Sequence, residues 1–193
     1  AEFLVNANES LAEASAFFRE ASTIIITLGT AWTFRFNATG EIVSNCLKRD
    51  AKEFTRERLS LKTCSVLLNS LVGKYPQKRF IFTVSPIRHL KDGAHGNQIS
   101  KSTLLMAVES VVENHPDQCA YFPAYEIMMD ELRDYRFYAE DMVHPSQQAV
   151  NYIWERFCDF ALPETERATL EKNRKAFLQS QHRIITKSQN TDK

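Results

Sequence analysis

The sequence lacks the hallmarks of several protein classes. Among its 193 residues, no run approaches the roughly 18 consecutive apolar residues of a membrane span. Its first residues, AEFLVNANES, have neither the basic start nor the apolar stretch of a signal peptide. Positive charge is not in excess, since Lys and Arg together number 24 and Asp and Glu together also number 24. We therefore expect neither a membrane nor a nucleic acid as a partner.

Cysteine is scarce and widely spaced. The four cysteines form no C-x-x-C pair and have no zinc-ligand spacing: Cys46, Cys64, Cys119 and Cys158. Three of them lie within apolar runs, which predicts buried free thiols and favours a reducing compartment such as the cytoplasm. His89 and His95 are six residues apart, but no residue provides a third metal ligand at a recognisable spacing. We expect no metal and no cofactor.

Apolar periodicity predicts an alternation of helices and strands. TIIITLGT (23–30) and RFIFTV (79–84) predict buried strands, the first of them buried on both faces, and CAYF (119–122) predicts a third strand. WTFRF, NATG and EIVSN predict a β-hairpin. Helices are expected at 8–21, after a Ser60 cap, at 100–114, at 125–133, after a Ser146 cap, and from Pro163 to about residue 182. This pattern defines an α/β fold with a parallel sheet and right-handed crossovers.

The length fits one domain. We expect an α/β domain over residues 1–162, followed by a charged helix and tail over 163–193. Three core strands make a thin sheet for this much helix. The sequence is therefore interpreted as the latter part of a larger α/β domain, a fragment or a processed product.

Polar residues follow the predicted strands, where open α/β sheets bind ligands. Gly29 and Thr30 end the first strand, and the Gly29 N–H is a candidate oxyanion donor. Ser85, Arg88 and His89 follow the second strand, and the Arg88 guanidinium is suited to a carboxylate or phosphate. The alternative is that these residues only shape the loops.

The segment AEDMVHPS (139–146) holds the clearest catalytic pattern. Asp141 lies three residues before His144, so the acid can orient the imidazole and stabilise its protonated form, as in a Ser-His-Asp triad. The alternative is a solvated surface loop. A nucleophile is harder to find, because Ser85, Thr30 and Cys46 all lack a nucleophile-elbow sequence such as G-x-S-x-G.

Long blocks of the chain resemble the GSCFA-domain proteins, bacterial relatives of the SGNH (GDSL-type) hydrolases. The blocks are IIITLGTAW, NCLKRDAKEFTRERLS, TVSPIRHLKDGAHGNQISKSTLL, YFPAYEIMMDELRDYRFYAEDMVHPS and AVNYIWERF, which together span about residues 1–160. The resemblance implies a flavodoxin-like, three-layer α/β/α fold. It also implies that His144 is the base of the D-x-x-H block and that Asp141 orients it.

Two features depart from the family pattern. The Gly-Ser-Cys-Phe-Ala block, with its presumed nucleophilic Ser, does not occur in the sequence. The resemblance therefore implies a nucleophile N-terminal to Ala1, missing N-terminal strands, and an inactive chain when isolated. LGTAW has Ala31 where SGNH hydrolases carry an oxyanion-hole Asn, and Asn45 is our candidate for the replacement donor.

Our leading hypothesis is an SGNH-like esterase or acyltransferase of the bacterial cytoplasm that acts on an acylated carbohydrate or another small ester. The alternative is a non-catalytic module of the same fold that binds a carbohydrate or another ligand. Because an incomplete sheet exposes strand edges and apolar faces, self-association is a further expectation.

Overall fold

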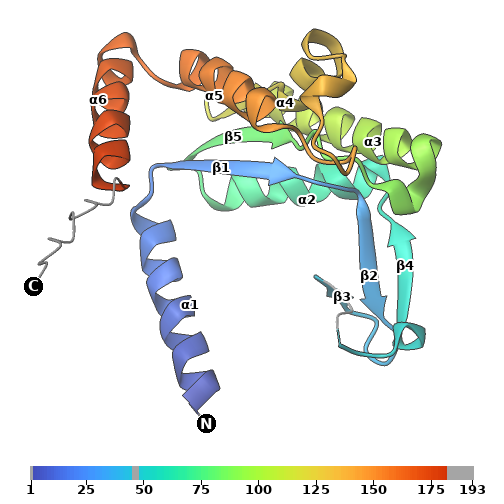
Figure 1. Cartoon of the computed structure of the whole chain (residues 1–193). Coiled ribbons are helices and arrows are strands. Elements are labelled where there is room, and N and C mark those ends of the chain that lie inside the picture. Colours follow the sequence, from blue (N-terminus) through green and yellow to red (C-terminus); the bar gives the residue numbers. More distant parts are fainter. Residues whose placement is uncertain (1, 45–47, 182–193) are drawn as a thin grey trace, which may run out of the picture. The chain divides into compact units, whose positions relative to one another are not determined.

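The computed structural model describes residues 2–44 and 48–181. Its main element is a three-stranded parallel sheet in the order β1-β5-β6 (Figure 1). The strands are β1 (Thr23–Leu28), β5 (Arg79–Val84) and β6 (Cys119–Phe122). Helices separate them along the chain, so the predicted α/β class and the three predicted core strands are confirmed.

Helices α2 (Leu61–Lys74) and α3 (Gly93–Asn114) cover one face of this sheet (Figure 1). As predicted, Ser60 caps α2, where its hydroxyl accepts the backbone N–H of Thr63 at 3.1 Å. Phe80 and Phe82 of β5 pack against these helices and are at most 1% exposed. The core therefore lies between the sheet and the α2–α3 pair, with these side chains at its centre: Val72, Phe80, Phe82, Val108, Val111 and Cys119.

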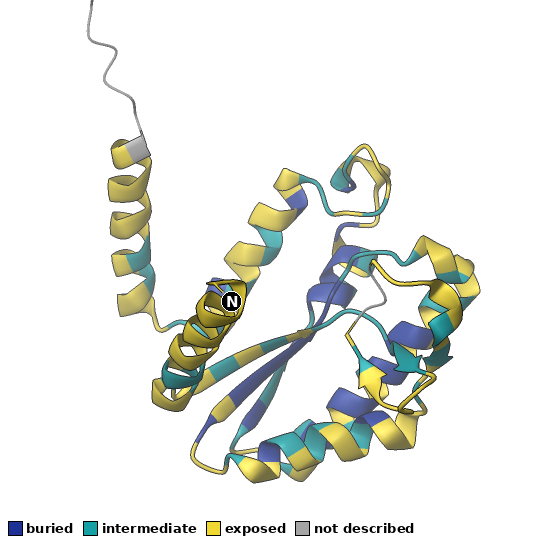
Figure 2. Cartoon of the chain, turned by 90° about the horizontal axis from the view of Figure 1, so that it is seen from below, coloured by how far each residue is buried: buried dark blue, intermediate teal, exposed yellow. Residues whose placement is uncertain are grey.

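The prediction that residues 23–30 are buried on both faces is wrong. Along β1, exposed and half-buried residues alternate, and Ile25 is 54% exposed (Figure 2). In this sheet β1 is an edge strand that pairs only with β5, and α2 and α3 cover only the face that carries Ile24, Ile26 and Leu28. A run of β-branched residues predicts a strand, but it does not predict whether that strand is central or at the edge of the sheet.

A smaller antiparallel sheet follows β1, in the order β3-β2-β4. Its strands are β2 (Trp32–Phe36), β3 (Ile42–Val43) and β4 (Phe54–Arg58), with a 3-10 turn at Ala51–Glu53 before the last. The β2–β3 hairpin confirms the prediction, and Gly40 in its turn has a φ of 73° that favours glycine. FTRER was not expected to form a strand, because a segment with so many charged side chains gives no apolar pattern from which its pairing with β2 could be predicted.

Helix α3 begins earlier than the predicted residue 100. A 3-10 turn, Leu90–Asp92, leads directly into it at Gly93, whose φ of 65° lets the chain change direction. Two glycines, Gly93 and Gly96, made this stretch resemble a loop. Asn97 and Gln98 consequently lie on the helix, where backbone geometry fixes their positions.

Short helical turns follow β6: α4 (Ala124–Glu126), a π-helical turn (Ile127–Glu131) and a 3-10 turn (Tyr135–Phe137). The longer helices near the chain ends are α1 (Glu2–Glu20), α5 (Gln147–Ala161) and α6 (Glu164–Gln181). The Ser146 hydroxyl accepts the backbone N–H of Ala149 at 3.3 Å, as expected of a cap at the start of α5. None of the described helices is long and apolar enough to cross a membrane.

The chain forms two compact units, residues 1–150 and 151–193, so α5 contains the boundary. The predicted division at residue 162 stays a prediction. In the second unit, Arg167 Nη1 pairs with Asp159 Oδ1 at 2.6 Å and links α6 to the end of α5.

Cys64, Cys119 and Cys158 are buried free thiols, as predicted, whereas Cys46 lies outside the described residues.

Candidate functional site

Asp141 organises the AEDMVHPS loop through both carboxylate oxygens. Oδ1 accepts the backbone N–H groups of Val143 at 2.9 Å and His144 at 3.0 Å. Oδ2 lies 2.5 Å from Nδ1 of His144, which confirms the hydrogen bond that the spacing predicts. The backbone N–H of Ala139 donates to the His144 carbonyl at 2.8 Å and closes the loop at its base.

These contacts determine the charge of Asp141 and the tautomer of His144. Hydrogen bonds from the His144 backbone, from its side chain and from Val143 lower the pKa of Asp141 to about 2. An ionised carboxylate only accepts hydrogen bonds, so Nδ1 of His144 must carry the proton. In the neutral imidazole Nε2 is then the basic nitrogen. The side chain is 57% exposed, so this base is open to a reactant.

Arg88 fastens the loop after β5 to the AEDMVHPS loop. Its backbone N–H donates to the Val143 carbonyl at 3.3 Å, and Nη1 donates to the Met142 carbonyl at 3.3 Å. The guanidinium carbon lies 3.8 Å from the centre of the Tyr138 ring, a cation–π distance. Two of the predicted site segments therefore meet in space.

Lys101 of α3 joins the ends of β1 and β5, and sequence reasoning missed it. Its Nζ donates to the carbonyls of Gly29 and Ser85, each at 2.6 Å. The residue is only 1% exposed, and burial lowers its pKa to about 8. Its place three residues before the inward Leu104 was the available signal, because a helix brings positions i and i+3 to one face.

His89 contacts the same point of β1. Its Nε2 lies 3.1 Å from the Gly29 carbonyl and must donate to it, because a carbonyl only accepts. Burial, then the charge of Lys101, lowers the pKa of His89. Both residues bind the Gly29 carbonyl, so His89 acts here as part of the connection between the strand ends.

Thr30 and Ser85 also take part in internal hydrogen bonds. Thr30 Oγ1 lies 3.0 Å from the hydroxyl of Ser100, which also accepts the Ala31 N–H at 2.8 Å. The Ser85 N–H donates to the Leu28 carbonyl, and its hydroxyl accepts the Ile87 N–H. These contacts position the strand ends. The predicted oxyanion donor Asn45 lies outside the described residues.

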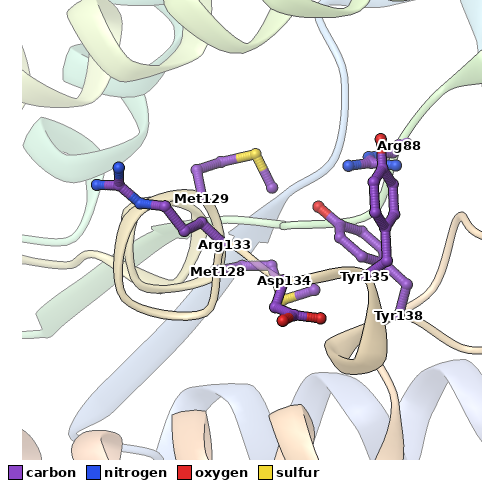
Figure 3. A pocket seen from close by; sticks show the side chains of 7 residues that line it. All are labelled: Arg88, Met128, Met129, Arg133, Asp134, Tyr135 and Tyr138. Atoms are coloured by element: carbon purple, nitrogen blue, oxygen red, sulfur yellow. The ribbon is translucent and has the colours of Figure 1, made fainter.

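Two cavities border Arg88. One, of about 190 Å³, is shown in Figure 3, where Arg88 lies close to the rings of Tyr135 and Tyr138. The other, of about 360 Å³, opens between the loop after β5 and the start of α3. Its lining includes Arg88, Gln98, Tyr125 and Tyr135. Within residues 2–44 and 48–181, no group of three His, Cys, Asp or Glu side chains is arranged to hold a metal ion.

Fold and site together define an α/β protein with an Asp–His pair and two cavities beside the carboxyl ends of its parallel strands. The chain belongs to the GSCFA family, whose model matches residues 1–157. No curated protein and no solved structure matches it.

Proposed function

We propose that this chain carries the acid–base half of an SGNH-like ester hydrolase or acyltransferase. His144 would remove the proton from a nucleophilic hydroxyl, and Asp141 would hold the imidazole in position and stabilise its protonated form. The proposal includes a three-layer α/β/α arrangement for the whole domain. Its substrate would be a small ester or an acylated carbohydrate.

The observation that carries the proposal is the 2.5 Å contact between Asp141 Oδ2 and His144 Nδ1. The same carboxylate also accepts two backbone N–H groups, so it has a fixed orientation. A solvated surface pair needs no such support, whereas a catalytic base needs a defined direction for its free nitrogen. The anchoring of this loop by Arg88 supports the same conclusion.

The proposal requires a nucleophile. The described hydrogen bonds of Ser85 and Thr30 are to other groups than His144, which argues against either as its partner. The family resemblance instead places the nucleophile on a Gly-Ser-Cys-Phe-Ala block, which the printed sequence does not contain. We therefore propose that a Ser on such a block acts as the nucleophile and that residues 1–193 alone do not turn over an ester.

The experiment is hydrolysis of 4-nitrophenyl acetate by a protein that joins this chain to such a block. We expect turnover that His144→Ala reduces by several orders of magnitude, since the other triad groups do little without the base. The control is His95→Ala, a histidine of α3 that is not in the loop. Equal turnover by both variants, or turnover by the present chain that Ser85→Ala abolishes, would refute the proposal.

The second candidate is a non-catalytic module that binds a carbohydrate or another ligand. The cavity of about 360 Å³ favours it, because this volume falls in the range of small-molecule sites. Binding without turnover in the extended protein would select this candidate.

We further propose a location in the bacterial cytoplasm, in keeping with three buried free thiols. The exposed face of β1 supports self-association of the chain as part of the same proposal.

A further inference from the structure

Successive hydrogen bonds fix the orientation of two side-chain amides, Asn97 and Gln98, that line the 360 Å³ cavity. The backbone N–H of His89 donates to Oδ1 of Asn97 at 3.0 Å, which determines the orientation of the Asn97 amide. Nδ2 of Asn97 then donates to Oε1 of Gln98 at 3.3 Å. The Tyr125 hydroxyl donates to the same oxygen. The Gln98 carbonyl oxygen is thereby occupied.

The group that Gln98 still offers to the cavity is its amide nitrogen, with two N–H donors. No described residue is hydrogen-bonded to this nitrogen in the structure. Arg88, on the same lining, has five N–H donors, of which its side chain gives one to Met142. Arg88 and Gln98 therefore present unused donors to the cavity, which suit a ligand that supplies acceptors.

The charged groups around the cavity favour a negatively charged ligand. Arg88 lines it, and the buried Lys101 ammonium lies 5.8 Å from the centre of the ring of Tyr125, another lining residue. The side chain of Asp92, the residue before Gly93 of the lining, is fully buried and paired with Arg56. The first turn of α3, which also lines the cavity, contains no acidic side chain, and Asp92 is the N-cap residue before it.

Apart from the imidazole of His89, the remaining lining is apolar or aromatic. Leu90, Met129 and the ring of Tyr135 offer flat or flexible surface to a carbon skeleton. A ligand that fits this wall has an acceptor-rich, negatively charged end and a ring or chain that packs against these side chains. A carboxylate matches a guanidinium in geometry as well as charge.

We propose that this cavity binds a free carboxylate of the substrate through Arg88 and Gln98. The substrate class would then be an ester that bears a second, unesterified carboxyl group. This assignment rests on the proposed function, since Arg88 also holds the carbonyls of Met142 and Val143 beside His144. The bound carboxylate would direct the ester group toward the Asp141–His144 pair.

The test is a titration of the 15N-labelled full chain with two pairs of probes, followed by 1H–15N NMR. The pairs are glucuronate with glucose, and benzoate with benzamide, which differ in the carboxylate. We expect at least one carboxylate to bind about ten-fold tighter than its neutral twin and to shift the Gln98 side-chain amide signals.

Two variants test the two donors. Arg88→Gln removes the guanidinium, and Gln98→Glu replaces the amide donors by a negative charge of nearly the same shape. Each should weaken carboxylate binding about ten-fold or more, while its spectrum verifies the fold. The matched control is Lys91→Gln, which removes a charge from the same loop outside the cavity lining and should leave binding unchanged.

Equal affinity for carboxylates and neutral twins would overturn the inference, as would carboxylate binding that survives both folded variants. His144→Ala should bind carboxylates normally, which separates the inference from the proposed function. Ester hydrolysis without a carboxylate preference would leave the function standing and remove the inference. Carboxylate binding without hydrolysis in the extended protein would refute the enzyme proposal alone.

Discussion

Strands β1 and β5 are hydrogen-bonded neighbours with similar sequences, TIIITL and RFIFTV, yet their burial differs. Five of the six β5 residues are buried, whereas in β1 exposed and half-buried positions alternate. The difference comes from position: β5 pairs on both sides, and β1 pairs on one. Amino-acid composition thus predicts a strand, whereas the adjacent strands and helices determine its solvent exposure.

The largest expected difference between the two strands is in stability. Phe82→Ala in β5 removes a fully buried ring and should lower the free energy of unfolding by about 3–5 kcal/mol. Ile25→Ala in β1 removes a side chain that is 54% exposed and should cost less than about 1 kcal/mol. Urea denaturation of both variants measures the contrast, and similar losses would show that β1 is buried in solution.

The carboxyl ends of these two strands share a contact, because Lys101 donates hydrogen bonds to a carbonyl at each of them. Burial lowers the pKa of its ammonium from 10.5 to about 8 in the folded chain. Between those values the unfolded chain binds one more proton, so the free energy of unfolding should rise with pH in this window. The contribution is on the order of 3 kcal/mol.

The difference between wild type and Lys101→Met, followed by urea denaturation from pH 7 to pH 10.5, isolates this rise. The variant should lack it, whereas Lys91→Met, at an exposed lysine, should keep it. An unchanged rise in Lys101→Met would mean that its ammonium is not held as the structure indicates.

A smaller effect concerns association. If the exposed face of β1 mediates contacts between copies, Ile25→Lys should reduce the average mass measured by light scattering, because a charge opposes apolar contact. Thr39→Lys, in the exposed β2–β3 turn, is the control and should not change it. A wild-type chain that is already a clean monomer would contradict self-association.

Local signals were sufficient for much of the fold. β-branched and aromatic runs predict β1, β5 and β6, and Ser60 predicts the start of α2 because a cap and its helix are adjacent in sequence. The Asp141–His144 bond was predictable for the same reason, since only three residues separate the partners.

Features that depend on distant residues were not predictable. Lys101 appeared to be one more helix lysine, and its role becomes visible only when Gly29 and Ser85, 72 and 16 residues away, are brought to it. The exposure of β1 likewise depends on which strands lie beside it. Gly93 and Gly96 concealed the start of α3, because a glycine-rich helical turn and a loop share their composition.

The central claim is that ionised Asp141 holds His144 in the tautomer of a general base. Long-range 1H–15N NMR on the 15N-labelled chain, at a pH where the imidazole is neutral, tests it directly. We predict a protonated Nδ1 and an unprotonated Nε2 for His144, and loss of this preference in Asp141→Ala. A protonated Nε2 in the wild type, or the same tautomer in both proteins, would contradict the account.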